Sequence, residues 1–264
     1  MKTPGSDLEA RERKARAILR ELKGVLIALS GGVDSSVLAS LAAEELGERA
    51  VAVTVLSAVY PRREIEAAKA LARRLGLLHS LVRVDHLAEI PGFADNPENR
   101  CYVCKRHLFG RLRQMADEHG LIMVHGEQLD DLSADRPGHQ AAEELGVRAP
   151  LAEAGLGKAD VRALARRLGL SVAEAPAMAC LATRFEYGTH LTEEALERVA
   201  AAEELLAQLG FSNYRARVHG SLVRVQVPPS EVPRLAAEDV RAKLVSEMHR
   251  LGFRYVTVDL EGYH

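Results

Sequence analysis

Short apolar runs alternate with amphipathic segments over the first two thirds of the chain. Each run is rich in aliphatic or β-branched residues, which is typical of strands buried in a parallel sheet. The segments between the runs carry apolar residues at helical spacing, and most of them stop at a glycine, as helices commonly do. We expect strands at 25–29, 51–56, 78–84 and 121–125, and helices at 8–22, 37–46, 63–75, 99–119 and 158–168.

This alternation determines the expected fold class. Strands that alternate with helices of this length build βαβ units, which form a parallel sheet covered by helices on both faces. The crossovers should be right-handed, and a ligand should lie beyond the carboxyl ends of the strands. The first part of the chain is therefore predicted to be an α/β domain with a parallel sheet.

The pattern changes near Thr192. A long segment rich in Ala, Glu and Leu predicts a helix that runs to Leu209. Strands at 214–219 and 222–227, a helix at 232–250 and a strand at 254–258 follow it. This order predicts a smaller C-terminal α+β domain. We place the two domains at 1–188 and 189–264, with the boundary near 187–191.

Composition and charge narrow the class of protein. The 264 residues include 35 Lys and Arg against 37 Asp and Glu, a formal net charge of −2. Such a balance argues against a dedicated nucleic-acid binder, whose surface would be strongly basic. No apolar run approaches the roughly 18 residues of a membrane span, and the charged N-terminal segment does not resemble a signal peptide. We expect a cytoplasmic protein without nucleic-acid or membrane partners, in which the 3 cysteines form no disulfide framework.

A polar loop with two glycines follows the first expected strand. Glycine allows a tight turn and a close approach to a ligand, and the unpaired N–H groups of the next helix attract phosphate or pyrophosphate. Neither the Walker pattern nor the dinucleotide-binding glycine pattern is present. A simple connecting turn is the alternative, but the serines and the aspartate, a candidate Mg²⁺ ligand, favour binding. The loop consists of Ser30, Gly31, Gly32, Val33, Asp34, Ser35 and Ser36.

In its strand-to-helix context this loop resembles the ATP-pyrophosphatase loop (PP-loop) of adenine nucleotide alpha hydrolase-like enzymes. The resemblance implies that the loop holds the pyrophosphate of ATP and that Asp34 takes part in catalysis. Enzymes of this superfamily cleave ATP between the α- and β-phosphates, adenylate an oxygen of the substrate and release pyrophosphate. They differ in the nucleophile that displaces AMP, which is ammonia in amidating members and sulfur in thiolating members.

The remaining motifs are similar to those of LarE-type sulfur transferases, and the likeness covers nearly the whole chain. They lie at 99–106, 126–131, 135–138, 148–151, 179–189 and 251–260. The resemblance implies a pyridinium dicarboxylate mononucleotide as substrate, whose carboxylates are adenylated and converted to thiocarboxylates for the nickel-pincer nucleotide cofactor. It also implies a sulfide or another sulfur donor, and a homo-oligomer such as a hexamer.

The three cysteines, Cys101, Cys104 and Cys180, all fall inside these motifs. In sacrificial members of the family, the cysteine at the Cys180 position gives up its own sulfur, and the other two cysteines are missing. Members with three cysteines resemble iron–sulfur thiolation enzymes that hold a [4Fe–4S] cluster by three thiolates, which are suitable soft ligands. We expect such a cluster, with Cys180 in the catalytic centre. The alternatives are a sacrificial Cys180, a zinc site, a redox pair, or cysteines with no such role.

Two further candidate residues, Glu127 and Arg136, come after the strand expected at 121–125. Glu127 and Arg136 lie where the ligand crevice of a parallel sheet should be, and we expect a nucleotide or substrate role for both. A solvated loop is the alternative.

The second domain contributes candidate anion ligands. Arg215 and Arg217 alternate on one expected strand, so they face the same side and are suited to hold a phosphate. The family resemblance matches both to phosphate-binding arginines and places Arg184 and Glu203 beside them. An exposed strand face is the alternative.

Other functions compete with sulfur transfer. A tRNA thiolase of the same superfamily would usually add zinc-binding modules and basic surfaces, and amidating NAD or GMP synthetases need no cysteine cluster. A nucleotide-binding regulatory protein that does not turn over ATP is the alternative from another class. Release of pyrophosphate that depends on the dicarboxylate nucleotide separates the regulatory protein from an adenylating enzyme.

Overall fold

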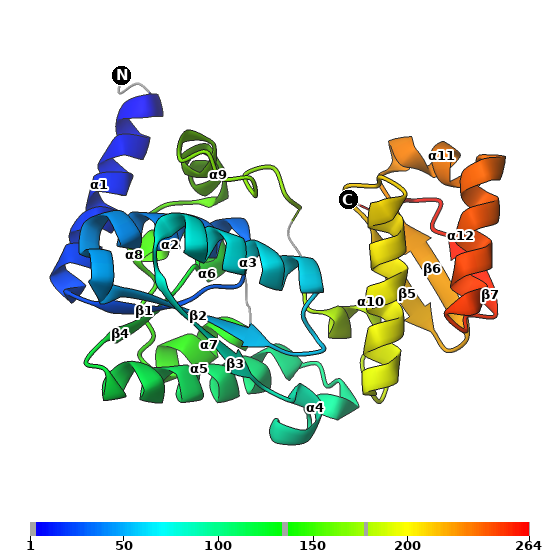
Figure 1. Ribbon diagram of the computed structural model, residues 1–264, viewed down its shortest axis with the longest axis horizontal. Helices are drawn as coiled ribbons and strands as arrows, with labels where there is room; N and C mark the ends of the chain where they lie inside the picture. Colours follow the sequence, from blue (N-terminus) through cyan, green and yellow to red (C-terminus); the bar gives the residue numbers. More distant parts are fainter. Residues whose placement is uncertain (1–3, 134–136, 177–178, 264) are drawn as a thin grey trace. The chain divides into compact units, whose positions relative to one another are not determined.

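The computed structural model describes residues 4–133, 137–176 and 179–263 (Figure 1). The chain divides into two compact units. The first unit comprises the described residues within Met1–Ser57, Arg62–Asp85 and Asn99–Ala177, and the second those within Ala58–Pro61, His86–Glu98 and Met178–His264. The second unit thus includes short segments that the sequence pattern assigns to the first domain. The domain division at 188/189 remains a prediction.

The first unit is built around a parallel sheet with the strand order β3-β2-β1-β4. The longer helices follow the strands as the pattern predicts, so the α/β fold class is confirmed. The strands are β1 (Val25–Ala28), β2 (Ala50–Leu56), β3 (Leu78–Arg83) and β4 (Ile122–His125). The longer helices are α1 (Pro4–Leu22), α2 (Val33–Leu46), α3 (Arg62–Leu75), α5 (Arg100–Glu118) and α9 (Lys158–Arg167).

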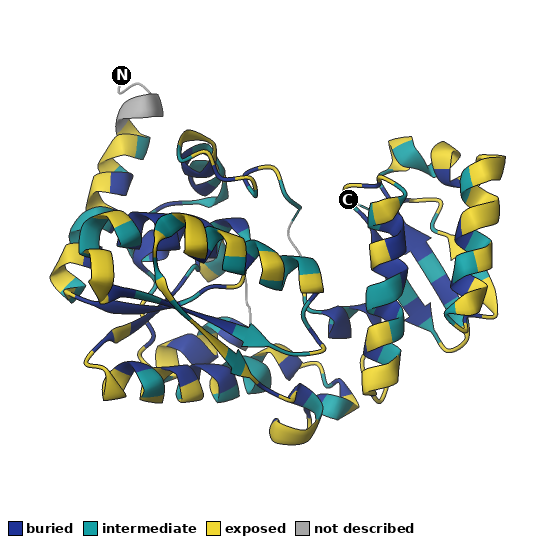
Figure 2. Cartoon of the chain, viewed as in Figure 1, coloured by how far each residue is buried: buried dark blue, intermediate teal, exposed yellow. Residues whose placement is uncertain are grey.

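Helices cover both faces of this sheet, with α1, α2, α3 and α9 on one side and α5 and α7 (Pro137–Glu144) on the other (Figure 1). Neighbouring residues of the central strand β1 point to opposite faces. Ile27 packs with Val37 and Leu164 on one face, and Leu26 packs with Phe109 on the other. The strand interior is accordingly buried (Figure 2). β1 is therefore fixed between two cores, and its carboxyl end is a rigid platform for the loop that follows.

Short helices in the first unit are additional to the predicted elements. They are α6 (Leu129–Ser133), α7 and α8 (Pro150–Glu153). Segments this short contain too few turns to show a helical repeat of apolar residues, so periodicity does not detect them. All of them follow β4, which places them near the carboxyl edge of the sheet.

The second unit contains a three-stranded sheet of order β5-β6-β7, in which β5 and β6 are antiparallel and β6 and β7 are parallel. Its α+β character agrees with the prediction. The predicted helix at 232–250 is two helices, because Ala237 has an extended backbone (ψ 139°) and no glycine or proline signals the break. The elements are α4 (His86–Glu89), α10 (Glu193–Gln208), β5 (Arg215–His219), β6 (Leu222–Gln226), α11 (Val232–Ala236), α12 (Glu238–Arg250) and β7 (Tyr255–Val258).

In the part of the chain that the structure describes, the helices are too short or too polar to cross a membrane.

Candidate active site

The loop between β1 and α2 is shaped by its first glycine. Gly31 has a φ of +85°, which residues with a side chain rarely adopt, and a Cβ at this position would lie 2.2 Å from the carbonyl oxygen of Glu64. α2 then begins at Val33 after Gly32, whose N-cap position supplies no side-chain hydrogen bond. The first-turn amides and the positive end of the helix dipole therefore face the loop without a capping side chain, which suits an anion.

The serine hydroxyls fix the loop from inside. The Ser30 and Ser35 hydroxyl oxygens lie 3.0 Å apart, and the Ser35 hydroxyl donates to the carbonyl oxygen of Gly32 at 3.1 Å. The Gly32 amide donates to the Ser30 hydroxyl at 3.3 Å. These bonds hold the loop in one conformation before any ligand binds, which reduces the ordering cost of binding.

The end of β4 touches the same loop. Gly126 follows β4 directly, and a Cβ there would lie 2.5 Å from the backbone nitrogen of Ser35. A residue with a side chain could not be accommodated without moving the start of α2. The carboxyl ends of β1 and β4 therefore converge, as expected for neighbouring parallel strands.

Sequence reasoning missed Lys158, the first residue of α9. Its ammonium nitrogen lies 3.1 and 2.9 Å from the two carboxylate oxygens of Asp34, and its amide donates to an Asp130 carboxylate oxygen at 2.6 Å. A cation at a helix N-terminus is unfavourable for the helix dipole. A lysine directly after the helix-starting Gly157 was the signal in the sequence that could have revealed this residue.

Glu127 lies buried at the centre of a basic cluster. The His139 Nδ1 atom is 2.8 Å from its Oε2 atom, the Lys105 Nζ atom is 3.8 Å from its Oε1 atom, and the His125 Nε2 atom is 3.7 Å from Oε2. Burial, together with the charges of Lys105 and His139, lowers the pKa of His125 to about 3, so His125 is neutral near pH 7 and forms no ion pair. Arg136 lies outside the described residues.

Two of the cysteines belong to the first unit and the third belongs to the second unit. Cys101 and Cys104 lie near the start of α5, where Cys101 is exposed and Cys104 is half-buried. Cys180 is half-buried and precedes the short 3₁₀ helix Leu181–Arg184 of the second unit. None of these three cysteines forms a disulfide. Among the residues described, no group of three or more His, Cys, Asp or Glu side chains is arranged to hold a metal ion.

A hydrogen-bonded chain connects Cys180 to two arginines in the second unit. The Thr183 hydroxyl donates to the Cys180 carbonyl oxygen at 2.7 Å and accepts from Arg184 Nη1 at 2.6 Å. Arg184 is buried and forms a bidentate pair with Glu203 at 2.6 and 3.1 Å. Arg217 donates to the Thr183 carbonyl oxygen at 2.9 Å, and burial beside Arg184 lowers its pKa. The structure therefore brings four of the predicted residues of this unit together.

Arg215 lies two residues before Arg217 on β5, so the two share one face of the strand. Its guanidinium stacks 4.5 Å from the ring centroid of Tyr263 and donates to the Tyr214 carbonyl oxygen at 2.6 Å. The side chain is buried, so these contacts fix the position of the guanidinium.

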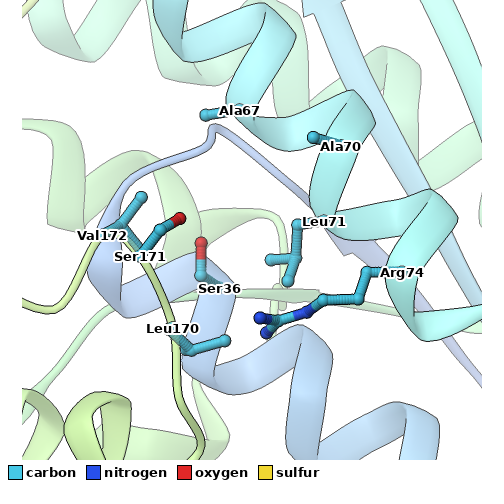
Figure 3. Close-up of a pocket in the computed structure, with 8 residues that line it drawn as sticks. All are labelled: Ser36, Ala67, Ala70, Leu71, Arg74, Leu170, Ser171 and Val172. Carbon is cyan, nitrogen blue, oxygen red and sulfur yellow. The ribbon is translucent and has the colours of Figure 1, made fainter.

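A cavity of about 120 Å³ adjoins α2 in the first unit (Figure 3). Figure 3 shows the guanidinium of Arg74 reaching from α3 toward the side chains of Ser36 and Leu170. Arg74 also donates to the carbonyl oxygen of Gly169 at 3.0 Å. Of the residues singled out in the sequence, Ser36 lines this cavity. The lining is Ser36, Ala67, Ala70, Leu71, Arg74, Leu170, Ser171 and Val172.

Comparison with known proteins places the chain among nucleotide-dependent enzymes. Residues 14–120 match the NAD synthase family. The chain is 41% identical over 257 residues to the uncharacterized protein slr1717 of Synechocystis sp. (97% of this chain and 96% of that protein). It is 34% identical over 249 residues to the pyridinium-3,5-bisthiocarboxylic acid mononucleotide synthase of Lactiplantibacillus plantarum (94% of this chain and 89% of that protein). Over a shorter stretch of 70 residues it is 37% identical to the NH(3)-dependent NAD(+) synthetase of Staphylothermus marinus (26% of each chain).

Proposed function

Because the chain belongs to the LarE-type family of ATP-dependent, PP-loop sulfur transferases, we propose that it makes a pyridinium bisthiocarboxylate mononucleotide. In this proposal a pyridinium-3,5-dicarboxylate mononucleotide is adenylated on each carboxylate and then receives sulfur. The observation that supports it most is the loop at 30–36, whose Gly31 and neighbouring Gly126 leave room for backbone alone. A rigid ring of amides at a helix N-terminus suits the pyrophosphate of ATP.

The described residues supply distinct steps of this reaction. A carboxylate is unreactive until its oxygen becomes a good leaving group, which adenylation provides. The amides at 33–35 and Lys158 would bind the phosphates, and Asp34 would hold Mg²⁺. Arg215 and Arg217, on one face of β5, would bind the phosphate of the mononucleotide, with Arg217 oriented by Thr183.

We propose an external source of sulfur carried at the cysteines. Cys101, Cys104 and Cys180 form no disulfide, and thiolates are the ligands that iron–sulfur clusters take, so the donor chemistry fits. Cys101, Cys104 and Cys180 would hold a [4Fe–4S] cluster, which would supply inorganic sulfide to the acyl adenylate. Cys101 and Cys104 lie one helical turn apart in α5, so both can face the same group. Sacrificial transfer from Cys180 is the competing source.

The reaction is tested with protein purified without oxygen and supplied with ATP, Mg²⁺, sodium sulfide and the dicarboxylate mononucleotide. We expect pyrophosphate release that requires the mononucleotide, and mass spectrometry should detect exchange of oxygen for sulfur. Several thiocarboxylates per chain indicate external sulfur, whereas one per chain indicates sacrifice of Cys180. Pyrophosphate release that is indifferent to the mononucleotide would contradict the proposed reaction.

The cluster is tested separately by iron and sulfide analysis. The parent should hold about four iron atoms and absorb broadly at about 400 nm. Cys101→Ser, Cys104→Ser and Cys180→Ser should each hold less iron than the parent. The cluster is ruled out if all three variants bind as much iron as the parent. A homo-oligomer, also proposed, is tested by sedimentation velocity.

A further inference from the structure

Lys105 follows Cys104 in α5 and lies four residues after Cys101, so it shares a face of the helix with Cys101. Its aliphatic stem packs across the backbone of Gly138, where a Cβ would lie 2.8 Å from Lys105 Cδ. The ammonium nitrogen lies 5.6 Å from the ring centroid of Phe109 and 3.8 Å from Glu127 Oε1. The helix, a glycine surface, an aromatic ring and a carboxylate thus define the position of this cation.

Among the residues that the structure describes, the Lys105 ammonium has a defined position but no hydrogen-bond partner. Two other lysines show the contrast, since Lys69 donates to Glu66 at 2.8 Å and Lys158 to Asp34 at 2.9 Å. For Lys105 the structure records a carboxylate at 3.8 Å and no hydrogen bond within the described part of the chain. The side chain is 36% exposed, so its three N–H donors remain open to a small anion.

The Glu127 carboxylate is oriented mainly by a different residue. Its Oε2 atom takes the 2.8 Å hydrogen bond from His139 Nδ1, which leaves Oε1 toward Lys105. Glu127 is buried and its carboxylate is held by His139, so Oε1 has a defined position beside the ammonium on α5. Glu127 and His139 are therefore positioning residues for Lys105.

We propose that Lys105 is a specificity-determining residue that draws a small sulfur anion, hydrosulfide, to the cysteine-bearing face of α5. This inference rests on the proposed function, and within it on an external source of sulfur. A compact, strongly hydrated ammonium suits a compact monoanion, whereas a guanidinium suits planar anions such as carboxylate. Attraction by a half-exposed charge increases the local concentration of the anion and weakens with added salt.

The chemical step that Lys105 serves is balanced without an oxidant. A lone pair on the sulfur of hydrosulfide forms the C–S bond to the acyl carbon. The C–O bond to AMP breaks, and the electron pair of that bond leaves with AMP. The proton on sulfur passes to water, and the products are thiocarboxylate and AMP. Lys105 acts before this step by supplying the anion.

The test compares Lys105→Met with Arg106→Met, a loss of the same charge at the next position of α5, where the arginine is exposed. Holoenzyme purified without oxygen is assayed with sodium sulfide, ATP and the mononucleotide. Lys105→Met should raise the KM for sulfide about fivefold or more, with the KM for ATP and substrate-dependent pyrophosphate release within about twofold of the parent. Arg106→Met should match the parent. Lys105→Arg, which keeps the charge, should recover part of the loss.

A second variant and a salt titration separate attraction from structural damage. Glu127→Gln keeps Lys105 but removes its anchor, so it should raise the KM for sulfide by less than Lys105→Met. Added salt should raise this KM in the parent and leave it unchanged in Lys105→Met. The inference is overturned by an unchanged sulfide KM in Lys105→Met, by equal salt responses, or by loss of pyrophosphate release in that variant. If the parent adenylates its substrate but forms no thiocarboxylate from sulfide, then sulfide is not the sulfur source, and this inference fails together with that proposal.

Discussion

Acidification should destabilise the first unit through His125, the last residue of β4. Its imidazole is buried, with its ring centroid 5.1 Å from that of Phe109. Burial, and then the charges of Lys105 and His139, lowers its pKa from 6.5 to about 3. The folded chain therefore keeps this imidazole neutral at pH values where the unfolded chain has already protonated it.

The size of the effect follows from the two pKa values of His125. The unfolded imidazole titrates near about 6.5, and each pH unit below that value costs about 1.4 kcal/mol, because the unfolded state binds the extra proton. The stability contributed by neutral His125 is complete above pH 6.5 and declines as the pH falls toward the folded value of about 3. At about pH 5 the loss amounts to about 2 kcal/mol.

Urea unfolding of the parent and of His125→Gln measures this loss. The chain has no tryptophan, so far-UV circular dichroism is the suitable signal. Between about pH 7.5 and pH 5 the parent should lose about 2 kcal/mol more free energy of unfolding than His125→Gln, since glutamine does not titrate. Packing lost in the variant lowers the free energy of unfolding equally at both pH values. The difference between parent and variant in their pH dependence therefore reports the protonation of His125 alone.

The control is His119→Gln, which removes an exposed imidazole from the same unit. It should lose as much stability as the parent over this pH range. Equal losses in the parent and in His125→Gln would refute the reasoning, because they would show that burial does not depress the titration of His125.

Two further changes test other contacts. Lys158→Met removes the 2.9 Å ion pair with Asp34 and should raise the KM for ATP about tenfold, equivalent to about 1.4 kcal/mol. The urea midpoint should change little, because both side chains are part-exposed. An unchanged KM would mean that the pair is structural. Glu203→Gln leaves the buried guanidinium of Arg184 uncompensated and should lower the free energy of unfolding by about 3–5 kcal/mol. Its control is Glu174→Gln, which breaks an exposed pair with Arg166 and should change this free energy by less than about 1 kcal/mol. Equal effects of the two variants would contradict the role assigned to burial.

Most of the fold follows from local signals in the sequence. The strands β1, β2 and β4 are short, mostly apolar runs, and the long helices carry apolar residues at helical spacing, so period and length suffice to find them. The break at Ala237 carries no such signal, because alanine is compatible with a continuous helix. The helices α6, α7 and α8 are too short to show a period.

The candidate site was partly predictable for a similar reason. The loop at 30–36 is contiguous, so its glycines and serines can be read together. The cluster around Glu127 draws its members from three elements, β4, α5 and α7, and only the fold brings Lys105, Glu127 and His139 together. Likewise, the pairing of Arg184 with Glu203 joins a 3₁₀ helix to α10, which no spacing rule specifies.

Lys158 shows why a phosphate site can need a residue that its motif does not contain. The loop at 30–36 has amides, hydroxyls and one carboxylate but no cation, and Asp34 by itself would repel a polyphosphate. The cation comes from a residue 124 positions later, at the start of α9. There it opposes the helix dipole, and the contacts of its amide with Asp130 and its ammonium with Asp34 offset that cost. Because the ammonium reaches the loop from this unfavourable helix position, we include Lys158 with the loop in the proposed anion site.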